Sequence, residues 1–171
     1  MTPDSVKSAH SVALSNSLCN VRQIRVNSVS QSAGRCCKLG NCVNLLLYDA
    51  HNHLQDERLK PHRERIMSAI ANEGIAAMVV NGSCEADWPE VLSVAQYPQV
   101  IPSFGYHPWY VKERTADWQS ALLRCLEARP AAIGEIGLDR WIKDFDLPQQ
   151  EEVFIWQLRL AAERNLPVSI H

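Results

Sequence analysis

The sequence predicts an α/β fold of the (β/α)8 TIM-barrel type, truncated to about five βα units and preceded by an irregular N-terminal extension. Two observations predict this fold. Short apolar runs alternate with helical stretches after residue 44, and uninterrupted apolar strands are typical of parallel sheets that helices cover. Acidic and histidine residues also follow several of these runs, which is where parallel α/β barrels carry their catalytic groups.

Residues 1–44 differ in composition from the rest of the chain. They are rich in Ser and Asn, contain a single acidic residue and show no sustained periodicity. This composition favours an irregular or disordered extension, or a translation start assigned too far upstream. An organelle transit peptide is the alternative, because such peptides are rich in Arg and Ser and poor in acid. We therefore expect a boundary between an extension at 1–44 and a catalytic body at 45–171.

The catalytic body is predicted to alternate strands with helices. Each predicted strand is a short apolar run, and these runs are residues 45–49, 75–80, 100–105, 131–134 and 167–171. The helices expected between them are residues 61–74, 89–96, 116–128 and 148–165. The last helix has the clearest pattern, with an i, i+3, i+7, i+8 apolar stripe formed by Val153, Trp156, Leu160 and Ala161.

Proline and glycine set several of these expected boundaries. Pro61 is placed to open the first helix and Gly74 to end it. Pro102 weakens the third strand, because proline cannot donate a backbone hydrogen bond to a neighbouring strand. At 171 residues the chain is shorter than the roughly 250 residues of a typical complete barrel, so we expect the front part of one.

Charge and composition exclude some functional classes. The net charge of the chain is −2 and residues 1–44 contribute +4, which leaves −6 for residues 45–171. An acidic body argues against broad nucleic-acid binding by phosphate neutralisation, although bound metal ions can still hold a phosphate locally. No apolar stretch approaches the roughly 20 residues that cross a bilayer, so a cytoplasmic location is expected, with organelle targeting as the alternative. The six cysteines fit reduced thiols better than a disulfide scaffold.

Two histidines after the first strand form the first candidate metal-ligand pair. His51 and His53 are two residues apart, so in an extended segment both imidazoles point to the same side. Asp49 precedes them and is expected either to orient an imidazole or to accept backbone N–H bonds. A pair of surface histidines is the alternative for this motif alone.

Later strand ends carry further candidates. Glu135 lies between two glycines, where a carboxylate is suited to bridge two cations, and Asp139 follows as a functional or turn-forming acid. His107 precedes a proline, is expected at the same rim, and is suited to contact a substrate phosphate or shuttle a proton. Trp109 beside it is the tryptophan expected to touch substrate, whereas the pattern assigns Trp118, Trp141 and Trp156 to packing. The fifth strand ends at His171, a possible third nitrogen ligand.

Four motifs together resemble the TatD family of metal-dependent hydrolases, a family of amidohydrolase-like TIM barrels that includes deoxyribonucleases. The motifs are residues 49–53, 105–108, 134–139 and 166–171, and they occur in the family's order. The resemblance implies that two divalent metal ions (Mg, Mn or Zn) are bound. It implies that His51, His53, Glu135 and His171 are ligands, with Glu135 bridging, and that His107 lies near the phosphate. A further His and Asp of the family have no counterpart here.

The resemblance implies a phosphodiesterase that cleaves DNA with a metal-activated water. Two other hypotheses remain open. The first is a hydrolase of a small phosphoester, amide or lactone on the same scaffold, which the acidic body keeps in consideration. The second is a truncated barrel that is inactive or acts only by interaction. The oligomeric state is not predicted, and no membrane partner is expected.

Overall fold

The computed structural model describes residues 46–171. The extension predicted for residues 1–44 lies outside the described residues, as do His10 and the four cysteines of that segment. Cys84 and Cys125 are free, partly buried thiols, and burial raises the pKa of each. Among the described residues, no helix is long and apolar enough to cross a membrane.

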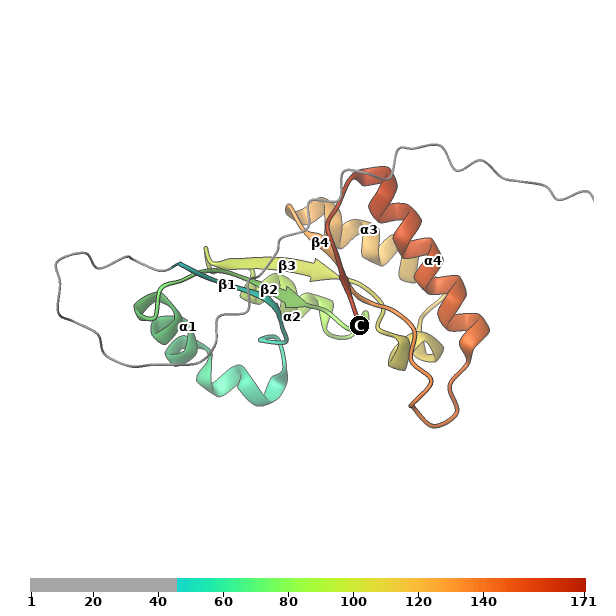
Figure 1. Cartoon of the computed structure of the whole chain (residues 1–171), viewed down its shortest axis with the longest axis horizontal. Helices are drawn as coiled ribbons and strands as arrows, with labels where there is room; N and C mark the ends of the chain where they lie inside the picture. The colour runs from blue at the N-terminus through green and yellow to red at the C-terminus, as the bar shows by residue number, and fades with distance from the viewer. Residues whose placement is uncertain (1–45) are drawn as a thin grey trace, which may run out of the picture.

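A parallel five-stranded sheet forms the centre of the described chain (Figure 1). The strands lie side by side in sequence order, as a succession of βα units requires. Their bounds are β1 Leu47–Asn52, β2 Ile75–Asn81, β3 Val100–Phe104, β4 Ala132–Ile136 and β5 Val168–Ile170. The predicted parallel α/β fold, with strands arranged as in part of a TIM barrel, is therefore confirmed.

Helices alternate with these strands and pack against the sheet. The α-helices are α1 Arg63–Asn72, α2 Trp88–Val94, α3 Trp118–Ala128 and α4 Leu147–Arg164. Two 3-10 helices, η1 Glu57–His62 and η2 Pro108–Glu113, follow β1 and β3. The core joins apolar side chains from helices and strands, such as Val91, Leu122 and Val153 with Val80 and Ile133.

The positions of several element ends differ from the sequence prediction. The first strand begins two residues later and runs through His51 to Asn52. The fourth strand continues to Ile136, so Glu135 lies within a buried strand rather than in a loop after it. Pro61 lies inside η1, and α1 begins only at Arg63. In each case the hydrogen-bonding partner, and not the local apolar pattern, fixes where the element ends.

Pro102 has the local effect that its missing N–H predicts. It is part of β3 and is paired with Val80 of β2. On the other side of β3, the ladder with β4 begins only at Ser103, which pairs with Ala132. Pro102 is thus tolerated in this central strand, because it lies before the part of the strand that is hydrogen-bonded to both β2 and β4.

Candidate metal centre

Glu135 of β4 lies at the centre of a group of four histidines. Its Oε2 atom is 3.1 Å from Nε2 of His51 and 3.2 Å from Nε2 of His53. Its Oε1 atom is 2.7 Å from Nδ1 of His171 and 3.6 Å from Nε2 of His107. The two carboxylate oxygens therefore face two different pairs of imidazoles.

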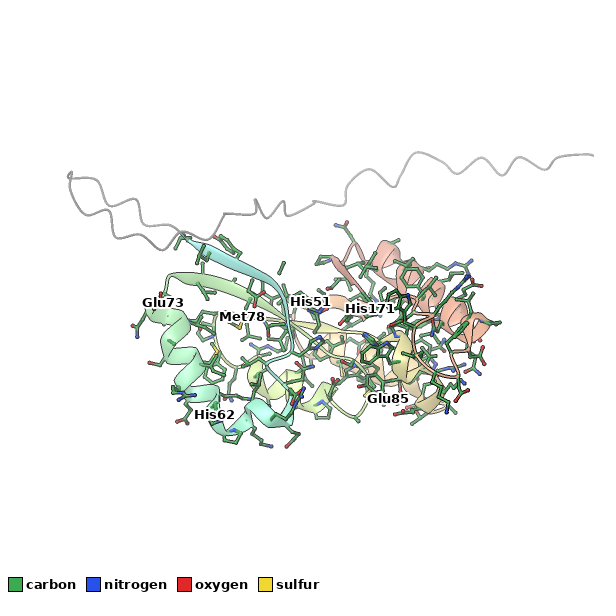
Figure 2. All side chains as sticks on the ribbon, turned by 60° about the horizontal axis from the view of Figure 1, so that its bottom comes forward. His51, His62, Glu73, Met78, Glu85 and His171 are labelled. Carbon is green, nitrogen blue, oxygen red and sulfur yellow. The ribbon has the colours of Figure 1, made fainter. Side chains whose placement is uncertain are left out.

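The sheet brings these side chains together from distant parts of the sequence. His51 comes from β1, and His171 directly follows β5. Figure 2 shows both near the middle of the fold, whereas His62 lies at its edge. His62 is exposed, as its lack of sequence context indicates. The residues meet because the carboxyl ends of parallel strands lie at one rim of the sheet.

Glycines on either side of Glu135 allow β4 to approach β5 closely. A Cβ atom added at Gly134 would lie 2.7 Å from the Cβ of Ser169, and one added at Gly137 would lie 2.9 Å from the Cβ of His171. Both distances are shorter than real side chains adopt, so any larger residue would push β5 away. The Gly-Glu-Ile-Gly segment thus places the carboxylate and His171 at contact distance.

The imidazoles of His51 and His53 are oriented by residues that the sequence patterns did not reveal. Nδ1 of His53 lies 2.8 Å from the backbone carbonyl oxygen of Asn81, so this nitrogen carries the proton and Nε2 is left facing Glu135. Nδ1 of His51 lies 2.9 Å from the Ser169 hydroxyl. A polar residue two positions before His171 was the only sequence signal for this contact.

His171 and His107 turn different ring nitrogens toward Glu135. Nε2 of His171 lies 3.1 Å from Oδ2 of Asp139, which leaves Nδ1 facing Glu135. Nδ1 of His107 instead accepts the backbone N–H of Trp109 at 3.1 Å, so its Nε2 carries the proton. His51, His53 and His171 can therefore offer a nitrogen lone pair to a cation, whereas a neutral His107 offers an N–H donor.

The pKa values describe two ionised carboxylates beside a neutral His107. Burial alone would raise the pKa of Glu135, but its close contacts with the imidazoles of His53 and His171 outweigh burial and bring this pKa to about 2. The indole N–H of Trp109 and the backbone N–H of Trp141 lower the pKa of Asp139 to about 2. Burial lowers the pKa of His107 to about 4, so His107 is uncharged at neutral pH.

Asp49 does not contact an imidazole among the described residues. Its carboxylate accepts the backbone N–H of His51 at 3.1 Å and the side-chain amide of Asn52 at 2.8 Å. This is the second of the two arrangements considered for Asp49 from the sequence. It stabilises the turn of the chain around the His-x-His pair.

Two buried glutamines of α4 hold the loops that carry His107 and Asp139, and no sequence pattern identified them. Gln157 accepts the backbone N–H of Tyr106 at 2.7 Å. Gln150 accepts the backbone N–H of Asp139 at 2.8 Å and donates to the Asp139 carbonyl oxygen at 2.9 Å. Both glutamines are fully buried. Polar residues on the inner face of a helix are their only sequence signal.

The packing role predicted for three tryptophans holds for two of them. Trp118 is buried and packs edge-on against Trp156, with ring centroids 4.8 Å apart. Trp141 is 98% exposed, so its predicted packing role is wrong.

The donor set fits a divalent metal site. Among the described residues, two groups have ligand atoms that all lie within 4.8 Å of one another inside the group. One group is His51, His53 and Glu135, and the other is His107, Glu135 and His171. Imidazole nitrogens and carboxylate oxygens suit cations such as Zn²⁺ and Mn²⁺. The contact with Glu135 raises the pKa of His53, as expected for an imidazole beside a carboxylate.

Comparisons with known proteins agree with this chemistry. Residues 48–171 match the family model described as TatD related DNase. An uncharacterized metal-dependent hydrolase of Methanocaldococcus jannaschii is 31% identical over 125 residues, covering 72% of this chain and 49% of the relative. A protein of Pantoea ananatis named 3′-5′ ssDNA/RNA exonuclease TatD is 32% identical over 129 residues, covering 73% of this chain and 49% of the relative.

A solved structure supports the same assignment. The crystal structure of YjjV, a TatD homolog from Escherichia coli, superposes with a TM-score of 0.67 at 29% identity. The match covers 72% of this chain and 49% of that chain. The chain thus spans about half the length of the relatives it matches.

Proposed function

The chain belongs to the family of TatD-related DNases, and on this premise we propose that the whole protein is a metal-dependent hydrolase that cleaves phosphodiester bonds of DNA. One observation carries this proposal. The two carboxylate oxygens of Glu135 face separate imidazole groups, His51 with His53 on one side and His171 on the other. This division suits a carboxylate shared by two cations.

The proposed roles follow from the orientation of each side chain. His51, His53, Glu135 and His171 would hold two divalent cations, and Glu135 would be the ligand common to both. Cations held there would supply Lewis-acid chemistry, which makes water a better nucleophile and offsets the negative charge of a phosphate. Asn81 and Ser169 orient His53 and His51 through their outer nitrogens, and Asp139 orients His171 in the same way.

His107 has a different proposed role from the ligands. Its Nε2–H lies 3.0 Å from Nδ1 of His171 and 3.6 Å from Oε1 of Glu135, and its ring is buried and uncharged. With cations bound to His171 and Glu135, this hydrogen would be donated to a phosphate oxygen of the substrate. A fixed donor in a buried position stabilises developing negative charge without reorganising. Glu135 has the lowered pKa of an ionised carboxylate at neutral pH, as a cation ligand must.

A second candidate is a hydrolase of a small phosphoester, amide or lactone. The net charge of −6 in residues 45–171 favours it, because a strongly acidic body repels long polyanions. The DNA hypothesis has stronger support, since relatives that match 73% of this chain are named ssDNA/RNA exonucleases.

The test is metal-dependent cleavage of single-stranded DNA by the protein at its natural length. We expect cleavage with Mn²⁺ or Mg²⁺, none in EDTA, and a loss of at least about 100-fold in Glu135→Gln, which keeps the shape of the side chain and removes its charge. His62→Asn, an exposed histidine outside the cluster, should cleave like the wild type. Unchanged cleavage by Glu135→Gln would remove Glu135 from the site, and cleavage of small esters alone would favour the second candidate.

A further inference from the structure

An open pocket lies directly beside the metal-ligand cluster. Its volume is about 530 Å³, and it is lined by Leu138, Asp139, Arg140, Trp141 and His171. Because His171 and Asp139 belong both to this lining and to the hydrogen-bonded cluster, the pocket and the candidate metal centre are contiguous. A substrate whose phosphate reaches the cluster therefore extends over this pocket.

Two exposed tryptophans, Trp109 and Trp141, donate hydrogen bonds to the Asp139 carboxylate beside this pocket. The indole N–H of Trp109 donates to Oδ2 of Asp139 at 2.6 Å, and the backbone N–H of Trp141 donates to Oδ1 at 2.6 Å. Trp109 is 51% exposed and stands 4.9 Å from the ring of His107 between centroids. One carboxylate thus fixes one indole ring and the backbone of the other next to the donor proposed for the phosphate.

The loop that carries Trp141 is anchored although its indole is free. Lys112 of η2 donates a hydrogen bond to the backbone carbonyl oxygen of Asp144. Together with the bond from the Trp109 indole to Asp139, this contact ties the 139–144 loop to the segment that follows His107, and the bond from the Trp141 N–H to Asp139 closes a turn within the loop. The exposed indole of Trp141 is therefore presented from a held backbone at the rim of the site.

We propose that Trp141, with Trp109 and Arg140, forms a subsite that stacks an unpaired nucleobase beside the metal centre. The proposal rests on the proposed function and names the side chains that would hold an unpaired base of its nucleic-acid substrate. An indole offers a flat apolar face to a base, and a guanidinium can stack on the same base or meet its phosphate. A small phosphoester without a base leaves this surface unused.

The charge of the body explains why stacking matters here. Residues 45–171 carry a net charge of −6, so phosphate neutralisation supplies little affinity for a polyanion. Stacking on an aromatic side chain contributes about 1–3 kcal/mol per base and does not depend on protein charge. Duplex DNA keeps its bases stacked on each other, so this subsite favours a free strand.

The test compares binding of two labelled strands to the full chain in EDTA, where no strand is cut. One probe is single-stranded oligothymidylate of about ten nucleotides, within the span of known single-strand sites. The other has the same backbone with abasic sugars. Fluorescence anisotropy gives the Kd of each probe for the wild type, Trp141→Ala, Trp141→Leu and Trp141→Phe. Because Trp141 is 98% exposed, these substitutions leave the core intact.

We expect Trp141→Ala and Trp141→Leu to raise the Kd for oligothymidylate by about 5- to 100-fold, since both lose the ring. Trp141→Phe should retain most of the affinity, and the abasic strand should bind all four proteins equally. Equal binding of oligothymidylate by wild type and Trp141→Ala would overturn the subsite. The subsite would also be overturned if Trp141→Ala weakened binding of the abasic strand as much as binding of oligothymidylate. The same holds if Trp141→Leu bound oligothymidylate as tightly as Trp141→Phe.

Cleavage of the same oligothymidylate in Mn²⁺ is measured separately, so the two proposals fail independently. Base-dependent binding that requires Trp141, without any metal-dependent cleavage, would support the subsite and contradict the hydrolase. Cleavage with no dependence of binding on Trp141 would support the hydrolase and overturn the subsite.

Discussion

At the scale of single residues, the role of each histidine depends on the hydrogen-bond partner of the ring nitrogen that faces away from Glu135. Nδ1 of His53 faces a backbone carbonyl oxygen, whereas Nδ1 of His107 accepts a backbone N–H. The first arrangement leaves a lone pair toward Glu135, and the second leaves a hydrogen. His53 and His107 both follow apolar strands, yet His53 presents a lone pair toward Glu135 and His107 presents an N–H group.

Replacing His107 should therefore affect turnover more than metal binding. For His107→Ala we expect kcat to fall by about 100-fold, the usual effect of removing one fixed donor to developing negative charge. The Kd for Mn²⁺ should stay within about threefold, because the Nε2–H of His107 is not a ligand in this account. Steady-state cleavage of single-stranded DNA and calorimetric Mn²⁺ titration measure the two quantities.

His62→Ala serves as the matched control, since His62 is exposed and lies outside the cluster. It should change neither quantity. A large loss of Mn²⁺ affinity in His107→Ala would contradict the donor role and make His107 a ligand.

The sequence predicted which residues meet but not what orients them. His51, His53, Glu135 and His171 were all predicted from strand ends, and the structure brings them together. The orienting groups were missed because one is a backbone carbonyl oxygen, that of Asn81, which no side-chain pattern reveals.

At the scale of elements, helix α4 positions two loops of the site through hydrogen bonds to their backbones. Gln150 and Gln157 are seven residues apart, which places them on the same face of a helix two turns apart. Gln150 bonds to the backbone of Asp139, and Gln157 to the backbone of Tyr106 next to His107. The helix thus couples the two loops through buried backbone hydrogen bonds.

Gln150→Leu should destabilise the fold and loosen the site. It leaves the N–H and carbonyl oxygen of Asp139 without partners in a partly buried position, which costs about 1–3 kcal/mol. Urea denaturation should show this loss of unfolding free energy. Glu151→Gln, at an exposed neighbouring position of the same helix, should change it by less than about 0.5 kcal/mol. Equal stability of the two variants would contradict the role assigned to Gln150.

The sequence predicted the existence and order of the elements better than their ends. The apolar run at 75–80 became β2 Ile75–Asn81 almost unchanged. The run at 131–134 became a strand that continues through Glu135, because β5 pairs with β4 as far as Ile136. A buried carboxylate interrupts an apolar pattern, so periodicity ends the strand too early where function requires a polar residue inside it.

At the scale of the whole molecule, the parallel order of the sheet makes the site possible. Strands β1, β4 and β5 are separated in sequence, yet their carboxyl ends carry His51, Glu135 and His171 to one rim. Glycines 134 and 137 keep β4 and β5 close enough for contact. The chain spans about half the length of its relatives.

The most direct test of the central claim is a calorimetric titration of the protein with Mn²⁺. We expect the wild type to bind two ions, His171→Ala to bind one, and Glu135→Gln to bind both at least about tenfold more weakly, because Glu135 is the shared ligand. His62→Asn should bind like the wild type. If Glu135→Gln and His171→Ala give the same titration as the wild type, the cluster around Glu135 is not a metal centre, and the account fails.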